Sequence, residues 1–438
     1  MYLLILVPKL TNRLHYIFDL ILKDLLGITF KLTTDSETFA SYNGPKMHYG
    51  SEQFWNEPFQ RSTNILFERN IKEQEPKIIE YNGLKAIFPV YSDSSMFPFD
   101  IFAASFYLVT RYEEYLPHVN DKYNRFKAED SILFKMGMIE KPLINIWAIE
   151  LSNILKKEYP ELAIKRKTFT FVPTYDVDAA WAYKNKGIFR ITAAFFRDLL
   201  NLDFKEIRER HRVLSGKQND PFDTFDLQLS LQKEMNLHPL YFILCGDYDV
   251  NDKNISLRNT NFQNLIKRLG DYANVGIHPS FSSFLNKEKI GKEIQALSKV
   301  LNREVNISRQ HFLRLSLPLS YQILIDLDIT DDYSMGYASQ AGFRAAIADT
   351  FRFYDLEHDI VTKLNIHPFT VMDGTLRDYL KLNNEASQAK IISLINEVKA
   401  VNGTFILLFH NETLSNEKRW KGWREIYTNI LNEALNNQ

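Results

Sequence analysis

The stretch Phe169-Thr-Phe-Val-Pro-Thr-Tyr-Asp-Val-Asp-Ala-Ala-Trp181 decides how the rest of the sequence is interpreted. Its first seven residues have the aromatic and β-branched composition of a strand, and Asp176 and Asp178 stand at the carboxyl end of that strand. Two carboxylates this close can hold a metal ion together, or divide into one metal ligand and one proton acceptor. The alternative is a simple turn, because Asp is common after strands. Pro173 cannot donate a hydrogen bond to a strand ladder, so we expect a bulge or an edge at that position.

The composition describes an ordinary globular chain. Its 438 residues suggest two or three domains, and its net charge of −1 gives no electrostatic reason to expect nucleic acid as a partner. The single cysteine, Cys245, excludes both an intramolecular disulfide and a cysteine metal cluster. The apolar run from Met1 to Val7 is typical of a buried first strand rather than of a signal peptide. We therefore expect a cytoplasmic protein without an integral membrane segment, and its oligomeric state is left open.

Two domains are expected, with a boundary near the polar, proline-containing segment 158–167. Residues 1–165 begin with a strand and a helical apolar stripe, which predicts a smaller α/β domain of unknown role. Arg111, Glu113 and Glu114 follow a helical pattern in this domain. They form either a polar site or a charge cluster at the helix end that holds the two domains together, and we favour the charge cluster.

Residues 166–438 alternate between short strands and amphipathic stretches. The expected strands are 169–175, 239–244, 274–277, 305–310, 333–335, 364–369 and 404–409. Seven strands separated by helices predict parallel βα units that close, or nearly close, into a barrel. The charged stretch 208–226 is expected to be a lid or a surface loop.

Polar side chains gather at the carboxyl ends of these strands, where a βα barrel places its catalytic groups. His278 ends the third strand, Arg309 and His311 follow the core of the fourth, Asp373 follows the sixth and His410 ends the seventh. One histidine in such a place is usually structural. Three histidines, together with the two aspartates of the first strand and an arginine, favour a functional site.

The order of these motifs resembles the polysaccharide deacetylase domain, carbohydrate esterase family four. The motifs are Tyr-Asp-x-Asp, Gly-Ile-His, Ser-Arg-x-His and Leu-Leu-Phe-His, and the resemblance covers about residues 168–438. Residues 1–165, with Phe-Pro-Phe-Asp and Arg-Tyr-Glu-Glu, resemble the uncharacterised domain that precedes such deacetylases in Bacteroidota-type bacteria. The resemblance implies a distorted seven-stranded (β/α) barrel, in agreement with the number of expected strands.

The resemblance also implies catalytic roles. Asp176 matches the general base, Arg309 the arginine that orients this base, and His410 the general acid. Asp373 matches the carboxylate that orients or tunes that histidine, although an Asp-Gly pair is as typical of a turn.

The metal ligands depart from the pattern of the family. Asp178 and His278 match the first two ligands, but the second histidine should stand four residues after His278, where this chain has Ser282. Serine is a poor ligand, and His311 is positioned to replace it from the next strand. We expect a divalent metal, with zinc favoured and cobalt or nickel as alternatives, held by Asp178, His278 and His311.

These roles imply a metal-dependent hydrolase that removes N-acetyl groups, as amide-linked acyl groups, from a sugar of a cell-surface polysaccharide or its precursor. Its partner would be an N-acetylated carbohydrate. The alternative is a non-catalytic carbohydrate-binding or assembly protein with a degenerate deacetylase barrel, and Ser282 is its best support. A nucleotide-sugar glycosyltransferase with an Asp-x-Asp metal motif is a third possibility, but it does not need three histidines at strand ends.

Overall fold

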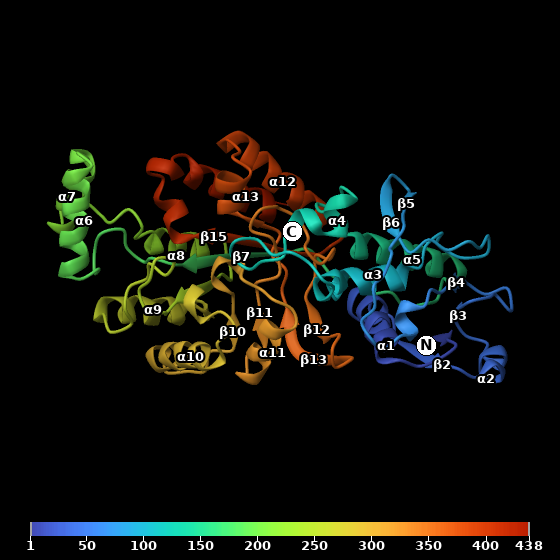
Figure 1. Ribbon diagram of the computed structural model, residues 1–438. Coiled ribbons are helices and arrows are strands. Elements are labelled where there is room, and N and C mark those ends of the chain that lie inside the picture. The colour runs from blue at the N-terminus through green and yellow to red at the C-terminus, as the bar shows by residue number, and fades with distance from the viewer. Residues whose placement is uncertain (1, 437–438) are drawn as a thin grey trace.

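A computed structural model describes residues 2–436 and shows an elongated molecule with its two main sheets at different places along its length (Figure 1). One sheet lies within the first 61 residues, and the other lies within residues 170–410. Helices α6 (Ile188–Leu200) and α7 (Phe204–Leu214) form the end opposite to the first sheet. Within the described residues, every helix is too short or too polar to cross a bilayer.

The first sheet has four parallel strands in the order β2-β1-β3-β4. The strands are β1 (Leu3–Leu6), β2 (Phe30–Thr33), β3 (Lys46–Gly50) and β4 (Phe59–Arg61). The expected apolar stripe lies on α1 (Asn12–Phe18) and on the π-helical turns that continue it to Leu25, and it is buried. The remaining elements of this region are α2 (Ser36–Ser41), the hairpin of β5 (Ile78–Tyr81) and β6 (Leu84–Ile87), α3 (Ile101–Val109), α4 (Ile132–Lys135) and α5 (Leu143–Glu158).

The second sheet has nine strands in the order β12-β13-β11-β10-β9-β8-β7-β15-β14. Their bounds are β7 (Thr170–Val177), β8 (Leu240–Leu244), β9 (Asn274–His278), β10 (Ile307–Ser308), β11 (Asp331–Asp332), β12 (Phe351–Asp355), β13 (Ile360–Ile366), β14 (Val371–Met372) and β15 (Thr404–His410). All neighbours are parallel except β12 and β13, which form an antiparallel pair. The prediction of a large sheet of parallel strands is therefore confirmed.

The predicted barrel differs from this sheet in strand number and in closure. Seven of the nine strands lie at or next to the expected positions, and β12 and β14 are additional. Among the described residues, the hydrogen-bonded ladder has β12 at one end and β14 at the other, so no closed barrel is present. The difference has two causes: β12 turns back along β13 as a hairpin, and β14 has only two residues, too few to show a periodicity.

Helices cover both faces of the second sheet (Figure 1). Helices α12 and α13 lie on one side, and α9, α10 and α11 lie on the other. Their bounds, with that of α8, are α8 (Phe225–Glu234), α9 (Thr260–Tyr272), α10 (Lys287–Leu301), α11 (Leu319–Asp326), α12 (Asn384–Ala400) and α13 (Trp423–Leu435). The charged stretch 208–226, expected to be a lid or a loop, is partly helical because α7 extends to Leu214.

Pro173 lies within β7 without a register shift. Its partner on β15 is Leu407, whereas pairing between β7 and β8 begins one residue later, at Thr174. The proline therefore stands where β7 has a neighbour on only one side. This local edge explains how a central strand accommodates a residue that has no N–H to donate.

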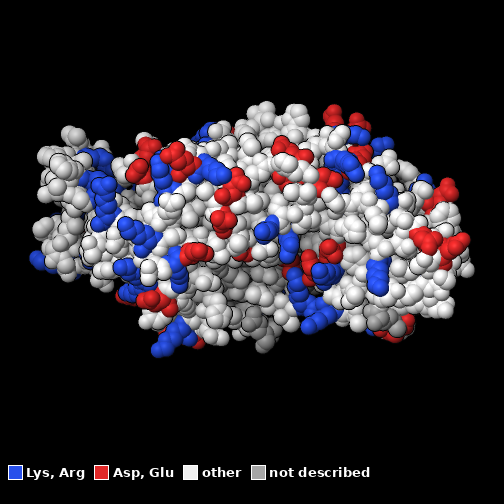
Figure 2. Space-filling view, turned by 90° about the horizontal axis from the view of Figure 1, so that it is seen from below, with Lys and Arg blue, Asp and Glu red and all other residues white. Residues whose placement is uncertain are grey.

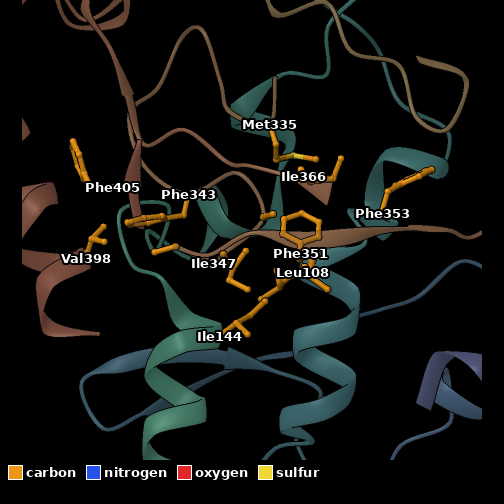
Figure 3. Close-up of a cluster of buried hydrophobic side chains, with 14 of the residues drawn as sticks. Leu108, Ile144, Met335, Phe343, Ile347, Phe351, Phe353, Ile366, Val398 and Phe405 are labelled. Atoms are coloured by element: carbon orange, nitrogen blue, oxygen red, sulfur yellow. The ribbon is translucent and has the colours of Figure 1, made fainter. Parts of the chain in front are cut away.

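One hydrophobic core joins the two regions. Leu108 of α3 and Ile144 of α5 lie beside Phe343, Ile347 and Phe351 of the second region (Figure 3). The same cluster of buried side chains extends from β1 to α13. The two sheets are thus connected by continuous apolar packing.

A buried charge cluster reinforces this junction. The Arg111 Nη1 donates to the Arg344 carbonyl oxygen at 2.6 Å, and the Arg344 Nη2 donates to Glu114 Oε2 at 2.6 Å. The Arg111 Nε completes the cluster with a bond to Glu114 Oε1 at 2.8 Å. The sequence left open whether Arg111, Glu113 and Glu114 form a polar site or a charge cluster between the two regions. These contacts favour the charge cluster.

The cluster predicts a pH-dependent stability. Burial opposes the charge of Glu114, but Arg344 and Arg111 outweigh it and lower the pKa of this carboxyl to about 2. Its contribution is therefore complete above the ordinary glutamate pKa and is lost as the pH falls toward 2. We expect Glu114→Gln to cost about 3 kcal/mol at pH 7, because two buried guanidinium groups lose their counter-charge. Melting temperatures of the wild type and the variant should converge as the pH falls below about 4.5; a constant gap would contradict this account.

Candidate active site

Four of the five consecutive strands β10-β9-β8-β7-β15 bring the predicted residues together at their carboxyl ends. Asp176 lies on β7, and Asp178 is the first residue after this strand. His410 on β15 is the register partner of Asp176. On the other side of β7, His278 ends β9, and β10 leads into Arg309 and His311. Because these strands are parallel, their ends share one edge of the sheet, and Asp176 and His410, 234 positions apart in sequence, become neighbours.

Asp178, His278 and His311 form a group that could hold a metal ion. One ligand atom from each lies within 4.8 Å of the others. The His278 Nε2 is 3.4 Å from Asp178 Oδ1, and the His311 Nε2 is 3.6 Å from Asp178 Oδ2. Two ligands at zinc bond lengths in a tetrahedral site lie about 3.3 Å apart, so this spacing fits a shared ion. Asp178 Oδ1 is also a buried oxygen without a hydrogen-bond partner among the described residues, as expected of an atom reserved for a cation.

Both imidazole rings are fixed through their Nδ1 atoms. The His278 Nδ1 lies 2.5 Å from the Arg309 carbonyl oxygen, and the His311 Nδ1 lies 2.9 Å from Asp252 Oδ1. Because both partners are acceptors, the ring proton belongs on Nδ1, and Nε2 is directed toward Asp178. A carbonyl or carboxylate behind each histidine is the usual support of a metal ligand.

The charges around Asp178 suit a cation site. Burial opposes ionisation of Asp178, but His311 and the other neighbouring histidines hold the pKa of this carboxyl well below its usual range. Burial also opposes the charge of His311, but Asp178 and Asp252 raise the pKa of this imidazole to about 9. A proton therefore occupies His311 in the metal-free protein, and a bound cation would displace it.

Ser282 does not point to this group. Its hydroxyl donates to Asp252 Oδ2 at 3.1 Å and accepts from the Lys289 Nζ at 2.7 Å. Asp252, which sequence reasoning missed, therefore connects Ser282 with His311. It lies in the loop after β8, where an aspartate looks like any other turn residue.

Asp176 is held by Arg309. The Arg309 Nη1 donates to Asp176 Oδ1 at 2.8 Å and also to the Thr174 hydroxyl at 2.8 Å. The guanidinium carbon of Arg309 lies 4.4 Å from the centre of the Phe242 ring, and the side chain is fully buried. The second oxygen of Asp176 faces the His278 Nε2 at 3.6 Å. One carboxylate oxygen is thus anchored, and the other faces the candidate metal group.

His410 is held by Asp373. The His410 Nδ1 is 2.8 Å from Asp373 Oδ1, and the His410 Nε2 is directed at Asp178 Oδ2, 3.7 Å away. Burial opposes the charge of His410, but Asp373 and Asp178 raise its pKa well above the usual value. Asp373 also accepts from the Gly374 N–H at 2.6 Å, but Gly374 has helical backbone angles, so a helical segment begins here rather than the turn that the Asp-Gly pair offered as an alternative.

The first region also reaches the site. The Arg125 Nη1 donates to the Phe312 carbonyl oxygen at 3.0 Å, and the Arg314 Nε donates to the Tyr123 carbonyl oxygen at 2.9 Å. Phe312 has a φ of 59°, a left-handed backbone that is costly for a residue with a side chain. Residues 123–125 therefore hold the strained turn that carries His311, a role that no local sequence pattern indicates.

Two cavities open onto these residues. The smaller, about 240 Å³, is lined by Asp176, Asp178, the three histidines, and aromatic side chains that include Tyr379 and Trp420. The larger, about 1050 Å³, extends from Asp178, His311 and His410 to α6. A ligand held beside Asp178 thus has space on two sides.

Residues 3–160 match the model of a family of unknown function, DUF7033. No curated protein matches the chain.

Solved structures similar to this chain include polysaccharide deacetylases and a CE4 family pseudoenzyme. One, from Mycobacterium smegmatis, is a putative polysaccharide deacetylase with 13% identity and a TM-score of 0.38; the match covers 60% of this chain and 84% of that chain. A probable polysaccharide deacetylase from Pseudomonas aeruginosa has 10% identity and a TM-score of 0.36, over 61% and 90% of the two chains. A CE4 family pseudoenzyme from Bacillus anthracis has 12% identity and a TM-score of 0.29, over 60% of each chain. At such identities, the site residues of this chain must be judged from their own geometry.

The metal group predicts how substitutions change zinc affinity. We expect Asp178→Asn and His311→Ala to weaken zinc binding by about 100-fold, and Asp252→Asn by about 10-fold because it orients His311. Ser282→Ala is the matched control and should change the affinity by less than about 3-fold, since serine is not a ligand here. Competition with a chromogenic chelator measures all four. A loss in Ser282→Ala as large as in His311→Ala would contradict the assignment.

The turn that carries His311 predicts a long-range effect of the first region. Arg125→Ala should weaken zinc binding by about 10-fold, because the Phe312 carbonyl loses the donor that fixes the turn. Lys122→Ala, which removes an exposed cation next to Tyr123, serves as the control and should behave as wild type. Equal affinities of the wild type and Arg125→Ala would show that the turn holds His311 without this contact.

Proposed function

We propose that this chain is a metal-dependent hydrolase that removes N-acetyl groups from a sugar of a cell-surface polysaccharide or its precursor. The observation that carries the proposal is the convergence of Asp178, His278 and His311 within 4.8 Å, next to Asp176 and His410. Amide hydrolysis by a metal-dependent enzyme requires a general base and a general acid beside a bound metal ion.

The three side chains that would hold the cation are two imidazoles and one carboxylate. This donor set is typical of zinc, and cobalt or nickel also accept it. A cation bound there would polarise the acyl carbonyl and lower the pKa of water. Three protein ligands leave further coordination positions for water and substrate.

Asp176 is the proposed general base. Arg309 occupies one of its oxygens and holds the carboxylate in place, so the other oxygen is available to accept the proton of water. The buried Arg309 guanidinium, 2.8 Å from Asp176 Oδ1, is the counter-charge of this carboxylate.

His410 is the proposed general acid. Asp373 binds its Nδ1 and stabilises the protonated ring, so the Nε2 carries the proton that the departing amine requires. Asp373 is therefore proposed to orient and tune His410. The Asp-x-Asp pair is divided between two tasks, since Asp176 is bound to Arg309 and Asp178 faces the histidines; a glycosyltransferase would not need this division.

The substrate class is supported by the resemblance of the motifs and by the shape of the site. Tyr379, which is 41% exposed, offers a flat apolar surface beside polar groups in a cavity of about 240 Å³, a combination that suits a sugar ring. We further propose that residues 1–165 and 166–438 are two domains, because the two main sheets share no strand, and that the protein acts in the cytoplasm.

The test is deacetylation of N-acetylhexosamine oligomers and nucleotide sugars with added Zn²⁺, Co²⁺ or Ni²⁺. Asp176→Asn and His410→Ala should each reduce turnover by roughly 100-fold, because each removes one proton transfer. His358→Ala is the control, since this histidine is exposed and pairs with Asp355 away from the site. Metal-independent turnover, or full activity of both site variants, would refute the proposal. Binding of the sugars without turnover would favour a carbohydrate-binding protein instead.

A further inference from the structure

Helices α6 and α7 form a hairpin that projects from the end of the molecule (Figure 1). Its large apolar side chains are exposed to solvent: Phe189 is 87% exposed and Leu200 is 84% exposed. The other exposed apolar residues of this α6–α7 hairpin are Ile188, Phe195, Phe196, Leu199, Leu202, Phe204 and Leu214. Apolar side chains gathered in this way on a surface mark a place of interaction.

Helix α6 has its polar side toward the protein. The Arg190 guanidinium donates to the carbonyl oxygens of Asn254 at 3.0 Å and Lys253 at 3.1 Å. Asp198 is buried and binds the guanidinium groups of Arg197 and Arg210. An amphipathic helix of a globular protein normally turns its apolar stripe to the core. Here polar contacts anchor the helix, and the apolar stripe faces outward.

The hairpin is also positively charged. Residues 184–217 contain nine lysines and arginines against four aspartates and glutamates, a net charge of +5 in a chain whose net charge is −1. Lys205, Arg208 and Arg212 are exposed on α7. Figure 2 shows the end that carries these helices, at the left, as white surface with blue patches beside it.

We infer that the α6–α7 hairpin docks on the surface of an anionic lipid bilayer. Exposed phenylalanine and leucine side chains would enter the boundary between headgroups and acyl chains, and the flanking cations would bind lipid phosphates. A second copy of the chain fits this face poorly, because two surfaces of the same positive charge repel each other. The helices lie on the bilayer rather than across it, since neither is long enough to span it.

Docking would also orient the candidate active site. The larger cavity, about 1050 Å³, is lined at one end by Phe189, Ala193 and Ala194 of α6 and at the other by Asp178 and His410. Its mouth would therefore lie close to the lipid surface, where acylated sugars attached to the membrane could enter. This consequence rests on the proposed function, whereas the docking itself does not.

Vesicle sedimentation of the full chain tests the inference. Wild-type protein should bind vesicles that contain about one-third phosphatidylglycerol, and it should bind pure phosphatidylcholine vesicles at least 10-fold more weakly. The double substitution Phe196→Ser with Leu200→Ser should weaken binding to the anionic vesicles by more than about 10-fold, because two buried apolar contacts are lost. Lys205→Glu with Arg208→Glu should weaken the same binding and reduce its dependence on salt.

The control is Tyr91→Ser with Val119→Ser, which removes two side chains that are 82% and 71% exposed in the first region. It should bind vesicles as wild type does. Absence of binding to anionic vesicles, or an equal loss in the control, would overturn the inference. The inference would also be overturned if light scattering shows an oligomer for the wild type and a monomer for the Phe196→Ser, Leu200→Ser variant. The hairpin would then be a contact between copies of the chain. No metal or sugar is present in this assay, so its failure is separate from failure of the proposed hydrolase.

Discussion

The negative charge of one carboxylate, Asp178, must be compensated by the side chains at the centre of this protein. Asp178 follows β7 with one oxygen toward His278 and the other toward His311 and His410. A carboxylate oxygen that is removed from water and lacks a hydrogen-bond donor is costly unless a cation or a protonated imidazole compensates it. The groups behind the histidines, the Arg309 carbonyl, Asp252 and Asp373, keep the rings in place for that purpose.

The turn that carries His311 also depends on the first region. His311 lies next to a left-handed Phe312, and the donor that satisfies the Phe312 carbonyl is Arg125 of the first region. Further away, Arg111 and Arg344 share Glu114 in a buried cluster, and apolar packing continues between the regions. The first region therefore supports the turn that carries His311.

The sequence predicted the candidate site more fully than it predicted the sheet. Asp176, Asp178, His278 and His410 could be found because the ends of parallel strands meet at one edge, whatever the sheet does elsewhere. The sheet stays open at the hairpin of β12 and β13, and nothing in the seven expected strands revealed that hairpin.

Contacts between loops were beyond sequence reasoning. Asp252 contacts His311 across 59 residues, and Arg125 contacts Phe312 across 187 residues. Neither residue stands in a periodic pattern, so only the folded chain brings their partners into view. The outward apolar face of α6 was missed for a related reason, since periodicity shows that a helix is amphipathic but not which side meets the protein.

Anomalous diffraction at the zinc edge, from crystals grown with ZnCl₂, would show whether Asp178, His278 and His311 hold a cation together. We expect one strong peak about 2 Å from a carboxylate oxygen of Asp178 and from the Nε2 atoms of His278 and His311. A peak elsewhere, such as at the exposed group of Asp355, Glu357 and His358, with none beside Asp178, would contradict it.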